Sequence, residues 1–316
     1  MQCSSSCDSA RRAEYTVTNP PMIQTCRLSH AYSANSGVWD LDLVVPSGSI
    51  YAFIGPNGAG KTTTIRLLLG LLRATTGQIL INGMARSVDS RALPRIGSLV
   101  EGPSLYPHLT GRQNLRISAL LLGCNRRQIE DVLHIVGLLD AADRLVKQYS
   151  LGMRQRLGLA LALLGKPRLL ILDEPSNGLD PQGMAEMRSL LSELAKNQGL
   201  TIFLSSHLLD DIEKIATHVG LLHQGRLLAQ GELDKLRRNS LRVKCSNPGA
   251  AIALLTQAGR SVQQVEDALL VDAPAADAAV INRELVLAGI DVHALAVEQD
   301  TLEQFYRLAT SKTQAA

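Results

Sequence analysis

Residues 55–62 read Gly55-Pro56-Asn57-Gly58-Ala59-Gly60-Lys61-Thr62, which fits the pattern G-x-x-x-x-G-K-[ST]. An apolar stretch, Ser49–Ile54, precedes this loop and predicts a strand, and a helix is expected to follow from Lys61 to about Leu72. The glycines allow backbone N–H groups to turn inward around phosphate oxygens, and the helix N-terminus adds a partial positive charge. The loop therefore predicts a nucleotide-phosphate site at the junction of a strand and a helix.

The first side chains of the expected helix complete this phosphate site. Lys61 can reach the β- and γ-phosphates, the Thr62 hydroxyl can ligate Mg²⁺, and Thr63 can bond the α-phosphate. The residues expected to bind the nucleotide here are Gly55, Pro56, Asn57, Gly58, Ala59, Gly60, Lys61, Thr62 and Thr63.

A second apolar stretch, Leu169–Leu172, ends in two carboxylates, Asp173 and Glu174. In a sheet that carries a phosphate loop, the end of such a strand lies beside the loop, at the carboxyl edge. We expect Asp173 to hold Mg²⁺ through water and Glu174 to act as general base toward the attacking water. Taken alone, the Asp-Glu-Pro sequence is equally consistent with a solvated turn, and the upstream loop favours the catalytic interpretation.

The order of predicted elements indicates an α/β protein, with a parallel sheet flanked by helices. The composition shifts after about Ser240, and the remaining residues predict a strand, a helix, two strands, a helix, a strand and a terminal helix. We therefore expect a disordered tail at 1–21, a main domain at 22–240 and a small accessory α+β domain at 241–316. In the main domain, the clearest strands are expected within 22–54, at 169–172 and at 201–204, and helices within 110–165 and near 181–196 and 208–216.

Composition excludes several classes of protein. Of the 316 residues, 46% are apolar and 19% are charged, which is typical of a globular protein with a sizeable core. The formal net charge of +3 does not indicate a nucleic-acid partner. The most apolar stretch, 157–172, is interrupted at 166–168 and falls short of the roughly 20 residues that span a bilayer. The N-terminus lacks the apolar region of a secretory signal, so we expect a cytoplasmic protein.

Four further segments carry a family resemblance. Tyr149–Arg156 resembles the signature segment of ABC cassettes, usually close to L-S-G-G-Q-x-Q-R. Ser176–Asp180 resembles the D-loop, Ser205–His207 resembles the H-switch, and Tyr32 stands where an aromatic residue stacks on adenine. The resemblance covers roughly 22–235, with all motifs in family order. It implies a P-loop NTPase cassette with a mixed sheet core, an antiparallel β subdomain and a helical signature subdomain.

The same resemblance implies roles for these residues in an ATPase that uses ATP and Mg²⁺. Ser150 and the Gly152 amide would contact the γ-phosphate of ATP held by a second copy of the cassette, so that two copies close head to tail. Asp180, in the D-loop segment, would belong to the same composite nucleotide site. His207 would hydrogen-bond the γ-phosphate and the attacking water.

The sequence departs from the family pattern at three positions. Leu151 and Met153 replace the usual glycine and glutamine of the signature, although its serine and its second glycine remain, so we expect a working site. Glu101, at the end of the predicted strand 96–100, stands where most cassettes have glutamine. It is expected to accept a hydrogen bond from metal-bound water and adds a charge beside Mg²⁺.

These variants resemble particular ABC transporters. Glu101, the segment Leu105–Thr110 and the form Tyr149–Met153 are similar to the bacitracin-resistance and lantibiotic-immunity cassettes, with daunorubicin-type drug and sodium-export cassettes as close relatives. The end of the accessory domain, Leu302–Tyr306, resembles the C-terminal extension of that group. The resemblance implies export of a peptide antibiotic, a drug or another amphiphile through a separate integral membrane permease.

In this group the cassette lies in the cytoplasm, peripheral on the inner face of the cell membrane, and the region 101–150 meets a permease helix. We expect Tyr106, Pro107 and Leu109 to line that contact, although an apolar cluster of an ordinary loop is an equally good interpretation.

Three other functions remain open. A soluble ABC ATPase of translation or DNA repair usually carries two cassettes or a long insertion, and this chain has neither. A small-molecule kinase needs a substrate pocket or lid and has no use for a signature segment. A regulatory cassette without turnover is consistent with Leu151 and Met153, whereas Glu174 and His207 argue against it.

Overall fold

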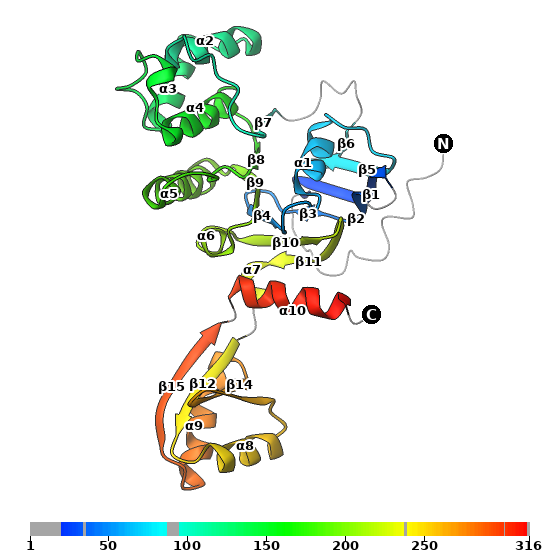
Figure 1. Cartoon of the computed structure of the whole chain (residues 1–316), viewed down its shortest axis with the longest axis vertical. Coiled ribbons are helices and arrows are strands. Elements are labelled where there is room, and N and C mark those ends of the chain that lie inside the picture. Colours follow the sequence, from blue (N-terminus) through cyan, green and yellow to red (C-terminus); the bar gives the residue numbers. More distant parts are fainter. Residues whose placement is uncertain (1–19, 34–35, 87–94, 237–238, 300, 315–316) are drawn as a thin grey trace. The chain divides into compact units, whose positions relative to one another are not determined.

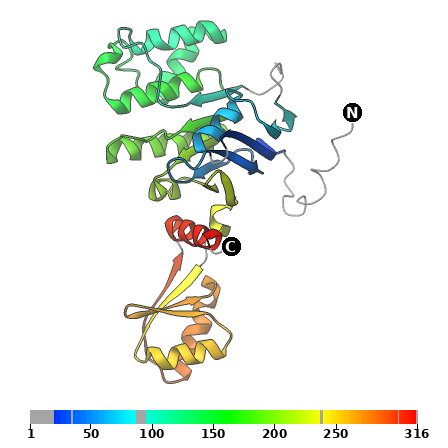
Figure 2. The same ribbon diagram turned by 45° about the vertical axis from the view of Figure 1, so that its right-hand side comes forward.

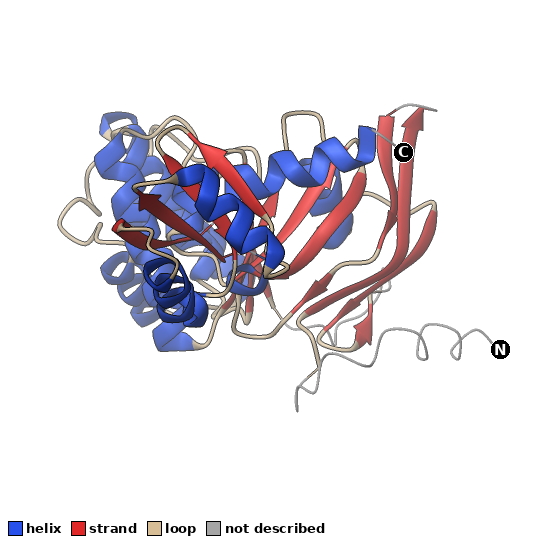
Figure 3. Ribbon diagram, turned by 90° about the horizontal axis from the view of Figure 1, so that it is seen from below, coloured by secondary structure: helices blue, strands red, loops and turns tan. Residues whose placement is uncertain are grey.

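The computed structural model describes residues 20–33, 36–86, 95–236, 239–299 and 301–314. Contacts divide the chain into two compact units, Met1–Glu232 and Leu233–Ala316. From composition we placed this boundary after residue 240. The disordered tail expected at 1–21 lies outside the described residues, apart from Pro20 and Pro21. Both units combine helices with strands (Figure 3).

A six-stranded sheet forms the centre of the first unit (Figure 1). Its strands lie in the order β11-β10-β4-β9-β8-β7, and all neighbours are parallel except β10 and β11. The carboxyl ends of β4, β8 and β9 share one edge, where Ile54 pairs with Ser206 and Asp173 with Ser205. This edge positions the candidate site. The strands are β4 (Ile50–Ile54), β7 (Ile96–Leu99), β8 (Leu169–Asp173), β9 (Thr201–Ser206), β10 (His218–His223) and β11 (Arg226–Glu232).

Helix α1 (Lys61–Leu69) packs between this sheet and a smaller antiparallel sheet. The smaller sheet has the order β2-β1-β5-β6, with β3 also paired to β1. One apolar cluster joins both sheets to α1, and its members include Phe53, Phe203, Ile65, Leu68 and Leu28. The strands of the smaller sheet are β1 (Ile23–Ser33), β2 (Ser36–Leu41), β3 (Val44–Val45), β5 (Thr76–Ile81) and β6 (Met84–Ala85).

The expected end of α1 at Leu72 was wrong. The helix ends at Leu69, because Gly70 adopts the left-handed conformation with φ of 70° and the Leu71 N–H bonds the Arg66 carbonyl at 2.8 Å. The next element, β5, begins at Thr76.

Three helices between β7 and β8 form a helical subdomain, and α4 packs on β7. Thr110 and Asn125 start the first two helices with capping boxes. Arg112 clamps them, because it bonds Asp143 at 2.9 Å and also bonds Glu130, and these bonds raise the pKa of Arg112 above its usual value. The elements are α2 (Gly111–Leu122), α3 (Arg126–Ile135), the 3₁₀ turn Val146–Gln148 and α4 (Leu151–Leu163). Two further helices, α5 (Pro181–Gln198) and α6 (Leu209–Glu213), follow β8 and β9.

The second unit contains a four-stranded antiparallel sheet in the order β13-β14-β12-β15. Its βαββαβ order is that of the ferredoxin-like motif and confirms the predicted order of elements. Leu255 of α8 and Ile281 of α9 share an apolar cluster with Val243 and Val271 of the sheet. The elements are α7 (Leu233–Leu236), β12 (Asn239–Cys245), α8 (Pro248–Gln257), β13 (Val262–Val265), β14 (Ala268–Asp272), the 3₁₀ turn Ala275–Asp277, α9 (Ala278–Leu287), β15 (Val292–Gln299) and α10 (Leu302–Gln314).

The close packing of α4 on β7 gives a stability prediction. A methyl group at Gly97 would lie 2.2 Å from the Ala162 carbonyl oxygen, so Gly97→Ala must push α4 from the sheet. We expect a loss of about 1–3 kcal/mol in the free energy of unfolding, measured by urea denaturation. Gly165→Ala is the matched control, because its methyl group would meet Arg95 at an ordinary 3.6 Å. Equal stability of the two variants would contradict the packing argument.

Candidate ATP-hydrolysis site

The phosphate loop joins β4 to α1 through positions that only glycine permits. A methyl group at Gly55 would lie 2.4 Å from the Leu222 carbonyl oxygen, and one at Gly60 would lie 2.6 Å from Val38. Gly60, with φ of 107°, begins α1 without a side-chain cap. The first N–H groups of the helix therefore remain available to an anion.

Lys61 connects this loop to Glu174, which follows the end of β8. Its ammonium group is buried, donates a hydrogen bond to the Gly55 carbonyl at 2.7 Å, and lies 3.2 Å from Glu174 Oε1. A buried ammonium without a counter-charge would be costly, so the contact with Glu174 stabilises both groups. The charge of Lys61 is thereby held at the mouth of the loop.

The buried carboxylate of Asp173 receives two hydroxyl hydrogen bonds. Thr62 Oγ1 donates to Asp173 Oδ2 at 2.8 Å, and Ser205 Oγ donates to Asp173 Oδ1 at 2.5 Å. Sequence reasoning did not assign Ser205 to the site. The signal that identifies it is the register of the parallel strands, in which Ser205 is directly opposite Asp173.

Glu174 leaves the end of β8 in a conformation that is rare for residues other than glycine, with φ of 49°. The turn is held by its N–H, which donates to Ser205 Oγ at 3.0 Å. Its carboxylate lies 2.8 Å from His207 Nδ1 as well as beside Lys61. The structure therefore brings together five of the predicted residues, namely Lys61, Thr62, Asp173, Glu174 and His207.

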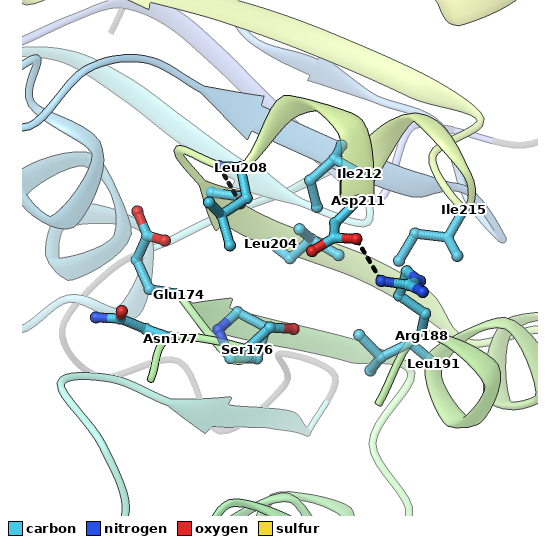
Figure 4. A pocket seen from close by; sticks show the side chains of 12 residues that line it. Glu174, Ser176, Asn177, Arg188, Leu191, Leu204, Leu208, Asp211, Ile212 and Ile215 are labelled. Carbon is cyan, nitrogen blue, oxygen red and sulfur yellow. Dashed lines mark hydrogen bonds and ion pairs between the residues drawn. The ribbon is translucent and has the colours of Figure 1, made fainter. Parts of the chain in front are cut away.

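A pocket lies behind Glu174, between the ends of β8 and β9, α5 and α6 (Figure 4). Its wall is aliphatic, with Leu191, Leu204 and Ile212, and an ion pair between Arg188 and Asp211 closes its far side. This pair joins α5 to α6, and α6 follows directly after His207. The pair thus fixes the helix that follows the predicted switch histidine.

Two of the predicted nucleotide contacts lie apart from this cluster. Glu101 forms an ion pair with Arg66 on α1, and no hydrogen bond joins it to Thr62 or Asp173 in the described part of the chain. The charge of Glu101 raises the pKa of Arg66, and a hydrogen bond with Tyr32 acts in the same direction. Tyr32 is 54% exposed at the end of β1, with its ring edge-on to His30 at 4.8 Å.

The signature segment packs against the D-loop of the same chain. Ser150 caps α4 by accepting a hydrogen bond from the Met153 N–H at 3.2 Å, and Asp180 caps α5. A pocket lined by Ser150, Gly152 and Asp180 runs along both segments. Among the residues that the structure describes, no hydrogen bond or ion pair joins the signature segment to the phosphate loop.

A glycine-rich loop at a helix N-terminus, beside a strand that ends in two carboxylates, defines a P-loop nucleotide-binding protein. The family model for ABC transporters matches residues 38–177. The bacitracin transport ATP-binding protein BcrA of Bacillus licheniformis is 43% identical over 293 residues, which cover 90% of this chain and 96% of that protein. The chain belongs to the ATP-binding subunits of ABC transporters.

Two further comparisons agree. The lantibiotic transport ATP-binding protein SrtF of Streptococcus pyogenes is 41% identical over 213 residues, covering 67% of this chain and 92% of that protein. The solved structure of cbiO1 of Clostridium perfringens, from the ABC transporter complex cbiONQ, is 25% identical with a TM-score of 0.64, covering 69% and 90% of the two chains. In the described part of this chain, every helix is too short or too polar to cross a bilayer.

The role of Ser205 can be tested directly. Ser205→Ala leaves the buried Asp173 oxygen and the Glu174 N–H without their shared hydroxyl. We expect a loss of about 1–3 kcal/mol in the free energy of unfolding, and phosphate release slowed about ten- to hundredfold because Glu174 is misplaced. The control is Ser189→Ala, whose hydroxyl bonds only the exposed Glu193 on α5. Unchanged stability and rate for Ser205→Ala would show that the hydroxyl is dispensable.

Proposed function

We propose that the chain binds and hydrolyses ATP with Mg²⁺ in a head-to-tail pair of cassettes, and thereby powers export of a peptide antibiotic, drug or similar amphiphile through a separate permease. The observation that carries this proposal is the cluster at the phosphate loop, where Glu174 meets both Lys61 and His207. A carboxylate between a lysine and a histidine at the edge of a P-loop sheet is suited to activate water at a γ-phosphate.

Glu174 is the proposed general base. Its carboxylate accepts a proton from the water that attacks the γ-phosphorus, and the bond from that phosphorus to the β–γ bridging oxygen breaks, which releases ADP and phosphate. Lys61 moves its ammonium group from Glu174 to the phosphate oxygens, so that ATP binding both places a positive charge on the phosphates and frees the base. His207, already 2.8 Å from Glu174, donates to the γ-phosphate.

The residues around Thr62 and Asp173 fit a magnesium ion. Their hydroxyl and carboxylate oxygens lie 2.8 Å apart and are the hard ligands that Mg²⁺ prefers, with water and phosphate oxygens completing the set. Bound Mg²⁺ neutralises developing phosphate charge. Glu101, which we also propose as a contact of the metal's water, must first leave Arg66.

The second half of the site is proposed to come from another copy of the chain. Ser150 and the Gly152 amide lie at the N-terminus of α4, where N–H groups and the helix dipole favour a γ-phosphate. Asp180 lines the same pocket. These residues pack on the D-loop and not on the phosphate loop of the same chain. A head-to-tail pair would therefore bring the signature segment of one copy to the phosphate loop of the other.

The loop before α2 is the proposed contact with the permease. Tyr106 and Pro107 are exposed, and Leu109 is half-buried. Buried Asn114 holds this loop, because its side chain accepts from the Tyr106 N–H at 2.8 Å and donates to the Tyr106 carbonyl at 3.2 Å. A rigid, exposed loop that follows Glu101 in sequence is well placed to relay the state of the nucleotide. The chain would then lie on the cytoplasmic face of the membrane.

The proposed cargo rests on the relatives. The bacitracin transport protein matches 90% of this chain, more than the first unit alone contains, so the likeness includes the accessory domain. A soluble ABC ATPase without a transport role is the alternative, and it is less well supported because both curated relatives described above are transport proteins.

Phosphate release from ATP by the purified chain tests the catalytic proposal. Glu174→Gln and His207→Ala should each reduce the rate at least about a hundredfold, because one removes the base and the other a γ-phosphate donor. Glu193→Gln, an exposed carboxylate change on α5, serves as the control and should retain the parent rate. A Glu174→Gln variant that hydrolyses ATP at the parent rate would remove Glu174 from the mechanism.

A further inference from the structure

Helix α2 of the helical subdomain carries apolar residues on two faces, and only one of them is buried. Leu115 and Ala119 face the interior with less than 3% exposure. Ile117, Leu120 and Leu121 follow helical spacing on another face and are 37%, 75% and 85% exposed. An amphipathic helix at the surface of a soluble domain normally presents polar side chains there, so this second face indicates a contact outside the chain.

The position of α2 leaves this face accessible. Within the helical subdomain, α2 contacts α3 and α4, and α4 lies against β7 of the central sheet. Figures 1 and 2 both show α2 as the outermost helix of this group, on the side away from the sheet. The helix ends at Leu122 and is capped by Gly123, so that Leu120 and Leu121 lie in its last turn, at the tip.

Positive charge predominates around the tip. Residues 111–129 contain four arginines and no aspartate or glutamate, and the first acidic residues, Glu130 and Asp131, follow one turn into α3. Arg112 is used internally, in its contacts with Glu130 and Asp143. The other three, Arg116, Arg126 and Arg127, are exposed, and none of them forms an ion pair within the part of the chain that the structure describes. Their guanidinium groups are free to meet an anionic surface.

We propose that this tip, formed by Arg116, Ile117, Leu120, Leu121, Arg126 and Arg127, docks on the surface of an anionic lipid bilayer. Such a surface has a headgroup region and, below it, an acyl-chain region. The protruding leucines can reach the acyl boundary, and the unpaired arginines can meet the lipid phosphates. A protein partner would need a groove for side chains that stand this far out, and a bilayer needs none.

The inference extends the proposed function, which places the cassette beside the membrane, but it does not depend on ATP turnover. The proposed permease loop, Tyr106–Leu109, leads directly into α2. Lipid contact at the other end of this helix would fix the helical subdomain relative to the membrane plane. The permease and the bilayer would then hold α2 at its two ends.

Flotation of the full chain with lipid vesicles tests the proposal. Vesicles containing phosphatidylglycerol should carry the chain, vesicles of pure phosphatidylcholine should not, and salt should weaken binding because the arginines are exposed. The double change Leu120→Gln with Leu121→Gln should lower the bound fraction about tenfold, and Arg126→Gln with Arg127→Gln should do the same. Leu287→Gln, an equally exposed leucine on α9, should have no effect.

Two results would overturn the proposal. One is the absence of binding to the anionic vesicles. The other is binding that depends on the arginines but not on the leucines, which is electrostatic adsorption without docking of the tip. ATP hydrolysis by the same variants should equal that of the parent, so a failure of the membrane proposal is distinguishable from a failure of the catalytic one.

Discussion

The parts of the site are held together by hydrogen bonds to one buried carboxylate, that of Asp173. Isolated in the interior, this charge would cost several kcal/mol. Hydroxyl groups from the start of α1 and from β9 compensate it, at 2.8 and 2.5 Å. Ser205 also receives the N–H of Glu174, which fixes the left-handed turn after β8. Three hydrogen bonds therefore join the start of α1, the end of β8 and the end of β9, which precedes His207.

This constraint explains why the phosphate loop, the carboxylates and the switch histidine lie together, whereas the signature segment lies elsewhere. Lys61, Glu174 and His207 form a chain of contacts at the sheet edge, where parallel strands end side by side. Ser150 and Gly152 start a different helix, in a subdomain inserted between β7 and β8. A second copy that supplies this helix end would add N–H donors to phosphates already held by the first, which makes closure sensitive to the γ-phosphate.

The sequence predicted the parts of the site that depend on local pattern. The loop at 55–62 and the strand ending at Asp173 are contiguous, and their chemistry follows from residue type. The contacts that it missed are long-range. The partnership of Ser205 with Asp173 depends on strand register, and the capture of Glu101 by Arg66 depends on the packing of α1. The early end of α1 was missed because Gly70 outweighs the apolar pattern that continues to Leu72.

The structure shows the surroundings of Leu151 and Met153, the two residues that depart from the family signature. Leu151 is 40% exposed, and a side chain added at Gly178 of the D-loop would lie 3.1 Å from it, so the leucine fills space beside that turn. The leucine that replaces the usual glycine thus lies at the junction between signature and D-loop. For Met153 the structure gives no specific consequence beyond its N–H bond to Ser150.

The central claim is that each catalytic site is shared between two copies of the chain, and mixing two inactive variants tests it most directly. Lys61→Ala removes the phosphate contact but leaves the signature, whereas Ser150→Ala with Gly152→Asp removes the signature contact but leaves the phosphate loop. Each variant alone should be inactive. A mixture should recover phosphate release, because a mixed pair contains one site with both halves intact. A mixed pair that forms, yet stays as inactive as its parents, would contradict the shared site.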